Sequence, residues 1–196
     1  STFHGCPPGE VEAIATHLME AHGLDCVVKL NPTLLGPAAV RALLHDALGY
    51  THLRVPDAAF ARDLGFDAAV ALLHRLAERA RRLGRRFGAK LTNTLVVDNT
   101  GSLLPPEARE VYLSGAPLHA LAVRLVRDLR RALPELPLSF SGGLDAQNVA
   151  DLVALDLAPA TVCSDWLEAG GYGRGARAFE SLVARMDAVH ASTREG

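Results

Sequence analysis

The chain has 196 residues, 49% of them hydrophobic, and this length and composition predict a single domain that buries a sizeable core. A formal net charge of -2 provides no broad basic surface of the kind that nucleic-acid-binding proteins carry. No apolar run reaches the roughly 18 residues that a membrane-spanning helix needs, so we expect neither nucleic acid nor a membrane as a partner.

The sequence contains three cysteines, Cys6, Cys26 and Cys163, and no two of them form a CxxC pair. This spacing argues against an iron–sulfur or zinc framework within the chain and is typical of a reducing, cytoplasmic environment. His4 has no second histidine or carboxylate at a supporting spacing, so we predict no metal site.

The first half of the chain alternates between strand and helix patterns. Residues 1–3 have the composition of a strand end with no preceding Met, which indicates that the chain is a piece of a longer protein. Proline and glycine boundaries then predict a helix over 8–23, a strand over 26–31, a helix over 38–48, a strand over 50–55 and a helix over 66–83.

The second half continues this alternation around one irregular stretch. We expect a strand over 87–94, a long loop over 95–116, a helix over 118–133 and a strand over 138–141. A short helix that starts at Asp145, a strand over 160–164 and a helix over 177–189 complete the pattern.

About six βα units in this order predict a parallel sheet with helices outside, either a TIM-type barrel or an open doubly wound sheet. Six strands are two fewer than a closed TIM barrel contains. We therefore expect a partial TIM (β/α)8 barrel without its N-terminal strands. Residues 1–196 would then be one domain, the C-terminal part of a barrel that belongs to a longer protein.

Gly142 and Gly143 end a predicted strand just before the helix start at Asp145. Glycines permit φ > 0 and let a ligand approach the backbone, and the first helical turn offers unpaired N–H groups to an anion. The turn therefore either binds a phosphate or only redirects the chain. Arg174, in a later glycine-rich segment, either reaches that phosphate or is a surface residue.

Two lysines lie on strands whose polar side chains gather toward the C-terminal end. Strand alternation places Lys29 on one face with Asn31, and Lys90 with Thr92 and Thr94, while Asn93 falls on the opposite face. Buried lysines require an anion such as a flavin or enolate, a Schiff base with a carbonyl substrate, or pairing with carboxylates.

The chain carries six distinctive segments: STFHGCPPGEVEAIA, VVKLNPTLLG, FGAKLTNTL, YLSGAPLHALAV, SFSGGLDAQNV and the stretch from TVCSD to GGYGR. Together they resemble the putative selenate reductase subunit (YgfK-type) family of multidomain iron–sulfur and flavin oxidoreductases. The last three segments are also distantly similar to the FMN-binding barrel of dihydroorotate and dihydropyrimidine dehydrogenases.

This resemblance implies an FMN-linked barrel that passes hydride between the flavin and a planar cyclic substrate. The iron–sulfur, FAD and NADPH sites of the family would lie outside this chain. The resemblance implies that the FMN phosphate is bound by Gly142, Gly143, Cys163 and Ser164. It places Asn93 and Thr94 near the isoalloxazine and the substrate, and either Lys29 or Lys90 at the flavin edge. The nearest counterpart of the family's catalytic cysteine is Cys6.

Two other functions remain open from the sequence. A non-catalytic barrel that mediates domain or subunit contacts predicts a plugged mouth, with Asp165 paired to Lys29 or Lys90. A lyase or aldolase would use one of the lysines as a Schiff base. The expected partners are other domains of the parent chain, a small-molecule substrate and, through an unpaired sheet edge, a second copy of the chain in a homo-oligomer.

Overall fold

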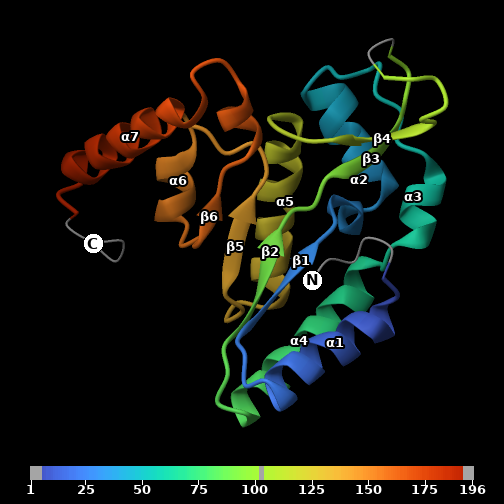
Figure 1. Ribbon diagram of the computed structural model, residues 1–196, viewed down its shortest axis with the longest axis vertical. Coiled ribbons are helices and arrows are strands. Elements are labelled where there is room, and N and C mark those ends of the chain that lie inside the picture. The colour runs from blue at the N-terminus through green and yellow to red at the C-terminus, as the bar shows by residue number, and fades with distance from the viewer. Residues whose placement is uncertain (1–5, 102–103, 192–196) are drawn as a thin grey trace.

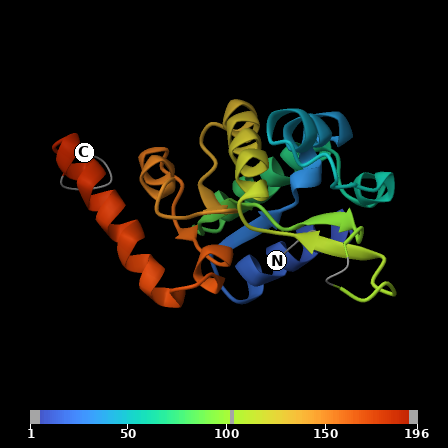
Figure 2. The same cartoon turned by 90° about the horizontal axis from the view of Figure 1, so that it is seen from above.

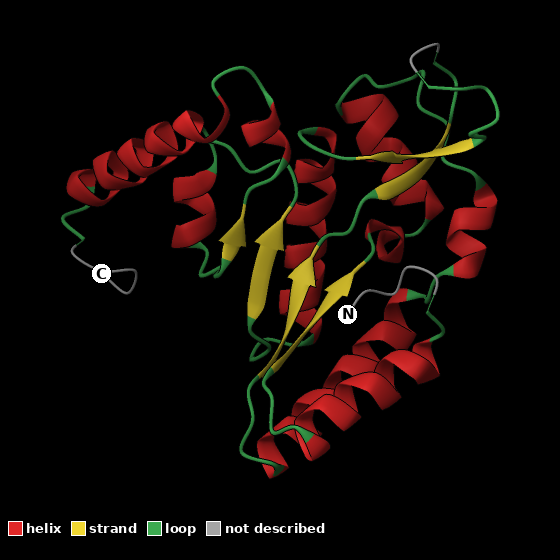
Figure 3. Cartoon of the chain, viewed as in Figure 1, coloured by secondary structure: helices red, strands yellow, loops and turns green. Residues whose placement is uncertain are grey.

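The computed structural model describes residues 6–101 and 104–191 and contains a four-stranded parallel sheet beside a two-stranded antiparallel hairpin (Figures 1 and 3). The predicted strand end at residues 1–3, and His4, lie outside the described residues. The parallel sheet consists of β1 (Cys26–Leu30), β2 (Phe87–Leu91), β5 (Leu138–Ser141) and β6 (Ala160–Thr161). The hairpin consists of β3 (Leu95–Asp98) and β4 (Glu110–Leu113).

The helices occupy the segments between the strands, and several begin at a proline whose fixed φ suits the first helical turn. Pro8, Pro37 and Pro117 hold such positions. The helices are α1 (Pro8–Ala21), α2 (Pro37–Arg41) with a π-helical continuation η2 (Ala42–Ala47), α3 (Asp57–Arg62), α4 (Phe66–Arg82), α5 (Pro117–Ala132), α6 (Val149–Ala154) and α7 (Arg174–Ala188). Short 3₁₀ turns are η1 (Pro32–Leu35), η3 (Ser164–Leu167) and η4 (Gly171–Gly173).

The order of the parallel strands decides between the two predicted architectures. The order is β1-β2-β5-β6, so each strand pairs with the parallel strand that precedes it in the chain and the order never reverses. A doubly wound sheet requires such a reversal, with helices on both faces. Alternate residues of the strands pack instead on α1, α4 and α5 in one continuous core. The fold is therefore a segment of a TIM-type barrel, as predicted.

The hairpin and the α2–η2 helix form a second, smaller core above the C-terminal ends of the strands. Its buried residues come from these elements, from the segment before α3 and from the first turns of α5; they are Val40, Leu44, Val55, Leu95, Val97, Leu118 and Leu121. This cluster fixes the hairpin over the end of the sheet where TIM barrels carry their functional residues.

Three expectations about local structure are wrong. Residues 50–55 form turns, because the N–H of Tyr50 bonds to Leu44 and that of Leu53 to Tyr50, which closes the end of η2. The expected loop 95–116 contains the β3–β4 hairpin, whose alternating burial was hidden by the Pro- and Gly-rich connection. The last strand ends at Thr161, because Ser164 begins a 3₁₀ turn.

Helix α7 stands away from the body of the molecule at the left of Figure 2. Gly175 is its only buried residue within the described chain, whereas α5 buries six. Among the residues that the structure describes, no helix combines the length and the apolar character needed to cross a membrane.

Candidate functional site

Two buried asparagines meet where β1 and β2 end. Asn31 follows β1 and is 2% exposed, and Asn93 lies two residues beyond β2 and is 7% exposed. Nδ2 of Asn93 donates to Oδ1 of Asn31 at 2.7 Å, and the Asn93 backbone N–H donates to the Leu30 carbonyl at 2.7 Å. Strand alternation predicted that Asn93 faces away from Asn31, and this is wrong. Strand β2 ends at Leu91, so the chain no longer has strand geometry at Asn93.

Asp63, just after α3, joins this amide pair. Its Oδ2 accepts from Nδ2 of Asn31 at 3.0 Å and from Oγ1 of Thr33 at 2.5 Å. Thr33 is also buried, so the carboxylate connects the loop between α3 and α4 to the end of β1. Strands β1 and β2 and this loop are thus tied together by side-chain hydrogen bonds at the carboxyl end of the sheet.

A cavity of about 470 Å³ opens beside this network. Cys6, Thr33, Asp63 and Thr94 contribute to its lining, and the ion pair between Arg62 and Glu110 (3.1 Å) lies at the same cavity. Partial burial, and secondly the Glu10 carboxylate 3.7 Å away, raise the pKa of the Cys6 thiol. The thiol is therefore protonated at neutral pH and suits a proton donor better than a nucleophile.

Lys29 and Lys90 lie directly opposite each other in the pairing of β1 with β2. They are the only two lysines in the sequence, which otherwise uses arginine for its permanent positive charges. Both are partly buried, and neither forms an ion pair with any residue in 6–101 or 104–191. Burial, and secondly the charge of Lys29, lower the pKa of Lys90.

The lysine pair occupies the face of the sheet that does not pack on the helices. Val28 and Leu30, on either side of Lys29 in β1, belong to the core under α1 and α4, so Lys29 points the other way. Ser139 of β5 stands next to Lys90 in the register, and its hydroxyl donates to the Pro159 carbonyl. A polar row thus crosses three strands on this free face.

The glycine turn after β5 meets two other loops at the start of α5. A Cβ on Gly143 would lie 2.8 Å from the Gly115 carbonyl oxygen, and one on Gly115 would lie 3.3 Å from Cβ of Ser164. Gly143, at φ +58°, is therefore required by close backbone packing, whether or not a ligand binds. The structure shows no acceptor for its N–H among the residues that it describes.

Asp145 does not start a helix, because α6 begins at Val149. Its side chain instead accepts from the N–H groups of Gln147 (2.8 Å) and Asn148 (3.2 Å), while Asn148 accepts from the Asp145 N–H and donates to the Gly143 carbonyl. These N–H groups are thus used within the loop, and the expected helix start at Asp145 is wrong.

Asp165 pairs with Arg174, through Nε at 3.0 Å and Nη2 at 2.5 Å, and not with either lysine. This is contrary to the plugged mouth that a scaffold barrel predicted. The hydrogen bonds that Arg174 donates to Asp165 raise the pKa of the Arg174 guanidinium. Arg174 thereby offsets the negative charge that Asp165 would otherwise present beside the glycine turn.

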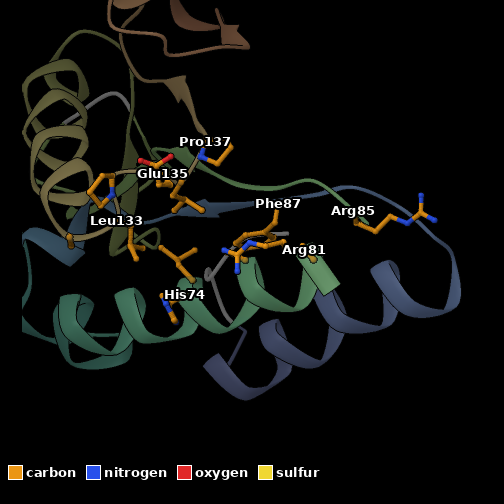
Figure 4. Close-up of a pocket in the computed structure, with 13 residues that line it drawn as sticks. His74, Arg81, Arg85, Phe87, Leu133, Glu135 and Pro137 are labelled. Carbon is orange, nitrogen blue, oxygen red and sulfur yellow. The ribbon is translucent and has the colours of Figure 1, made fainter. Parts of the chain in front are cut away.

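A second cavity, of about 460 Å³, lies at the other end of the sheet (Figure 4). It is bounded by the ends of α4 and α5 and by the residues around the starts of β2 and β5. Phe87, Leu133 and Pro137 belong to its apolar lining, Arg81 lies beside Phe87, and Arg85 extends away from the other lining residues. Functional residues of TIM barrels lie at the opposite, carboxyl end of the strands. We therefore place the candidate site at the Cys6 cavity and the lysine pair.

The structure places the residues that the sequence singled out in separate small groups. Cys6 and Thr94 line one cavity, Asn93 belongs to the amide network, and Lys29 faces Lys90. Cys163 is exposed and lines none of the described cavities at that end. Sequence reasoning assigned no role to Asn31, Thr33, Asp63 or Gly115; the matching K-L-N and K-L-T-N strand ends were the available signal for Asn31.

Comparison with known proteins identifies the family. A profile described as "Oxidoreductase YgfK, N-terminal TIM-barrel domain" matches residues 1–195. Two curated relatives, both named "Putative oxidoreductase YgfK", from Escherichia coli strain K12 and O157:H7, are 42% identical over 175 residues, or 89% of this chain. The chain spans only 17% of their length, and no solved structure matches it. The chain belongs to the family of YgfK-type oxidoreductase TIM-barrel domains.

Proposed function

We propose that this domain is the FMN-binding barrel of a larger electron-transfer oxidoreductase of the dihydropyrimidine dehydrogenase type. The observation that carries the proposal is the pairing of Lys29 with Lys90. Two partly buried ammonium groups without a carboxylate between them require an anion or a strongly electron-rich group. The N1 and O2 edge of a flavin is such a group, and its negative charge increases on reduction.

The other residues at this end of the sheet fit FMN as well. The N–H of Gly143 has no acceptor within the described chain, and it lies where the loops of Gly115 and Ser164 converge, which supports a phosphate at this point. The pairing of Arg174 with Asp165 removes much of the like-charge repulsion that a phosphate would meet. The backbone of Cys163 and of Gly142 would also contact this phosphate.

In this proposal FMN supplies the hydride chemistry, and the chain supplies orientation and a proton. The lysines hold the flavin edge, while Asn93 and Thr94 orient a planar cyclic substrate. Cys6, whose raised pKa keeps it protonated, donates the proton that balances hydride transfer to the substrate. Glu10, whose carboxylate accepts from this thiol at 3.7 Å, is exposed, so the thiolate that remains can be reprotonated from solvent.

The proposal extends to the longer polypeptide. Residues 1–196 would be one domain, the later part of a barrel whose remaining strands pair at the free edge of β1. Iron–sulfur and FAD/NADPH centres in other domains would exchange electrons with the flavin. The three cysteines are all unpaired, which supports a reducing, cytoplasmic location.

The test is an FMN titration of the full-length protein, followed by absorbance and by quenching of flavin fluorescence. We expect stoichiometric FMN in addition to any FAD. Lys29→Gln and Lys90→Gln should each weaken FMN binding about tenfold or more, because each removes a charged contact. Arg82→Gln, an exposed charge at the other end of the sheet, is the matched control and should leave the affinity unchanged.

Absence of FMN binding by the wild-type protein at saturating concentration would overturn the proposal. Equal FMN affinity in the wild type and both lysine variants would show that FMN binds away from Lys29 and Lys90 and that the lysine pair does not hold the flavin. A Gly143 variant is not informative here, because any side chain at that position collides with the backbone of Gly115 and Ala116.

A second function, Schiff-base catalysis, is favoured by the lowered pKa of Lys90, which increases the fraction of free amine. The two functions differ in their response to arginine. Lys90→Arg keeps the charge and should retain much of the FMN affinity, whereas it abolishes any Schiff base. Borohydride trapping with carbonyl compounds, mapped by mass spectrometry, would label whichever of Lys90 and Lys29 forms an imine; peptides 87–98 and 27–36 that both stay unlabelled would rule this function out.

A further inference from the structure

The amide network at the ends of β1 and β2 has a defined direction. A carboxylate accepts hydrogen bonds and does not donate them, so the contact with Asp63 requires the Nδ2 side of Asn31 to face it. The Oδ1 atom of Asn31 then faces Asn93 and accepts a hydrogen bond from Nδ2 of Asn93. One carboxylate thus fixes the orientation of two successive amides, although it touches only the first.

Burial makes this orientation costly to reverse. Asn31 is 2% exposed and Asn93 is 7% exposed, so little water is available to satisfy a group that loses its partner. If Asn31 turned over, its oxygen would face the carboxylate of Asp63 and its NH₂ would face the NH₂ of Asn93. Both contacts would be repulsive, and both pairs of groups would lose a buried hydrogen bond.

We propose that Asp63 is a positioning residue for the site at the carboxyl end of the sheet. By fixing Asn31 it holds Asn93 with Nδ2 occupied and Oδ1 unoccupied, since no described residue donates to Oδ1 of Asn93. A ligand that binds beside Asn93 therefore meets an acceptor and must present an N–H or O–H donor there. This statement about the ligand rests on the proposed function, whereas the control of orientation by Asp63 does not.

Thr33 explains why the loop after α3 can serve this purpose. Its hydroxyl donates to the same oxygen of Asp63 that Asn31 uses, so this oxygen accepts two hydrogen bonds. Thr33 itself is held in the 3₁₀ turn η1, where Gly36 N–H bonds to its carbonyl at 2.9 Å. The carboxylate is thereby held against the end of β1 from both sides and cannot follow a reoriented amide.

The test reverses the network. In Asn93→Asp, the new carboxylate faces Oδ1 of Asn31, and Asp63 prevents Asn31 from turning over to meet it. In the double variant Asn93→Asp with Asp63→Asn, Asn31 can turn over, donate to position 93 and accept from position 63. The number of carboxylates is the same as in the wild type. No described hydrogen bond joins Asp63 directly to Asn93, and each of them bonds to Asn31 instead.

The measurement is hydrogen–deuterium exchange of the full-length protein, read by mass spectrometry in peptides covering 27–36, 57–66 and 87–98. We expect Asn93→Asp to speed exchange in these peptides about tenfold, because a buried charged contact becomes repulsive. Asp63→Asn alone should change it about threefold or less, and the double variant should return to within about threefold of the wild type. Asn99→Asp, at a partly exposed asparagine bonded to Pro105, is the control and should show no coupling to Asp63→Asn.

Additive effects, in which the double variant exchanges at least as fast as Asn93→Asp, would overturn the proposal and leave Asp63 a residue that only stabilises its loop. Rescue of exchange in the double variant supports it. FMN titration of the same wild-type sample separates the two proposals. If the protein binds no FMN but shows the rescue, the flavin function is refuted and the positioning role of Asp63 is kept. If it binds FMN without the rescue, the flavin function is kept and the positioning role is refuted.

Discussion

Helices α5 and α7 are of similar length and both are amphipathic, yet α5 is largely buried and α7 is largely exposed. Of the 16 residues of α5, six are buried, including Leu121, Leu125 and Leu129 at 0% exposure. In the 15 residues of α7 only Gly175 is buried, and Phe179 and Val183 are 70% and 55% exposed. The pattern that predicts a buried face is present in both helices, and only one of them has a surface to bury it against.

The difference follows from the sheet beneath each helix. Helix α5 packs on the strands β2 and β5, whose Ala89, Leu91, Leu138 and Phe140 form the other half of its core. Helix α7 follows β6, a strand of two residues, and lies against α6 and two 3₁₀ turns instead. Amphipathic periodicity therefore specifies which face of a helix seeks burial, whereas the partner comes from elsewhere in the fold.

The largest expected effect tests this contrast directly. Leu125→Ala should lower the free energy of unfolding by about 2–5 kcal/mol, because it leaves a cavity in the core between α5 and the sheet. Val183→Ala in α7 removes a side chain that is mostly in water and should cost no more than about 0.5 kcal/mol. Urea denaturation followed by circular dichroism measures both. Equal losses would show that α7 is buried in the protein in solution.

The second comparison is between two glycines, Gly143, which packs beside the start of α5, and Gly171, which precedes α7. Gly143 and Gly171 both have a positive φ, +58° and +52°, but only Gly143 has backbone atoms, those of Gly115 and Ala116 beside α5, within reach of a Cβ. Gly143→Ala should cost about 3 kcal/mol, from the collision together with the unfavourable φ. Gly171→Ala, which precedes α7, should cost only about 1 kcal/mol, the backbone contribution alone. The same denaturation experiment applies, and equal costs would contradict the close packing of Gly143.

The smallest effect concerns charge on the outer faces of the helices. Burial by itself would raise the pKa of Asp128 in α5, but hydrogen bonds from Arg124 and Arg127 outweigh it and lower the pKa below its ordinary value of 3.8. Because the folded state binds the proton more weakly, the stabilisation is present above pH 3.8 and disappears as the pH falls through the lower, folded value.

Arg124→Gln should therefore cost about 0.5 kcal/mol at pH 7 and nothing in acid below the folded pKa of Asp128. Arg185→Gln in α7, an exposed arginine with no ion pair in the described part of the chain, is the control. Thermal unfolding between pH 2 and pH 7 provides the measurement. A difference between Arg124→Gln and the wild type that persisted at the lowest pH would show that Asp128 is not the partner responsible.

The sequence predicted the parts of the fold that rest on local periodicity. The leucines of α4 and α5 repeat every three to four residues. The strand around Val28 is rich in β-branched residues, and the strand around Phe140 alternates apolar residues with serine, so these elements were identified correctly. Residues 50–55 have a similar composition, but they form turns, and the Asp98 N–H of β3 bonds to the Arg54 carbonyl without a strand ladder being formed there. The β3–β4 hairpin was missed for the converse reason, since its pairing brings together Leu95 and Leu113 from two ends of an irregular segment.

The candidate site was predictable only where one residue type implied its own chemistry. A lysine on a buried strand is conspicuous, and Lys29 and Lys90 were found for that reason. Asp63 was not, because it follows a six-residue helix on the surface and gains its meaning from Asn31 and Thr33, about thirty residues earlier in the chain. Hydrogen bonds between distant segments leave no periodic trace in a sequence, so this part of the site required the structure.

The unbroken strand order has a consequence for how such a domain is assembled. Because every parallel strand docks beside the one before it, each βα unit can be added to an already folded edge without displacing earlier units. The entropy of closing each successive loop also varies little, since it grows only slowly with loop length. The sheet can therefore grow at the edge of its newest strand during synthesis, from β1 toward β6.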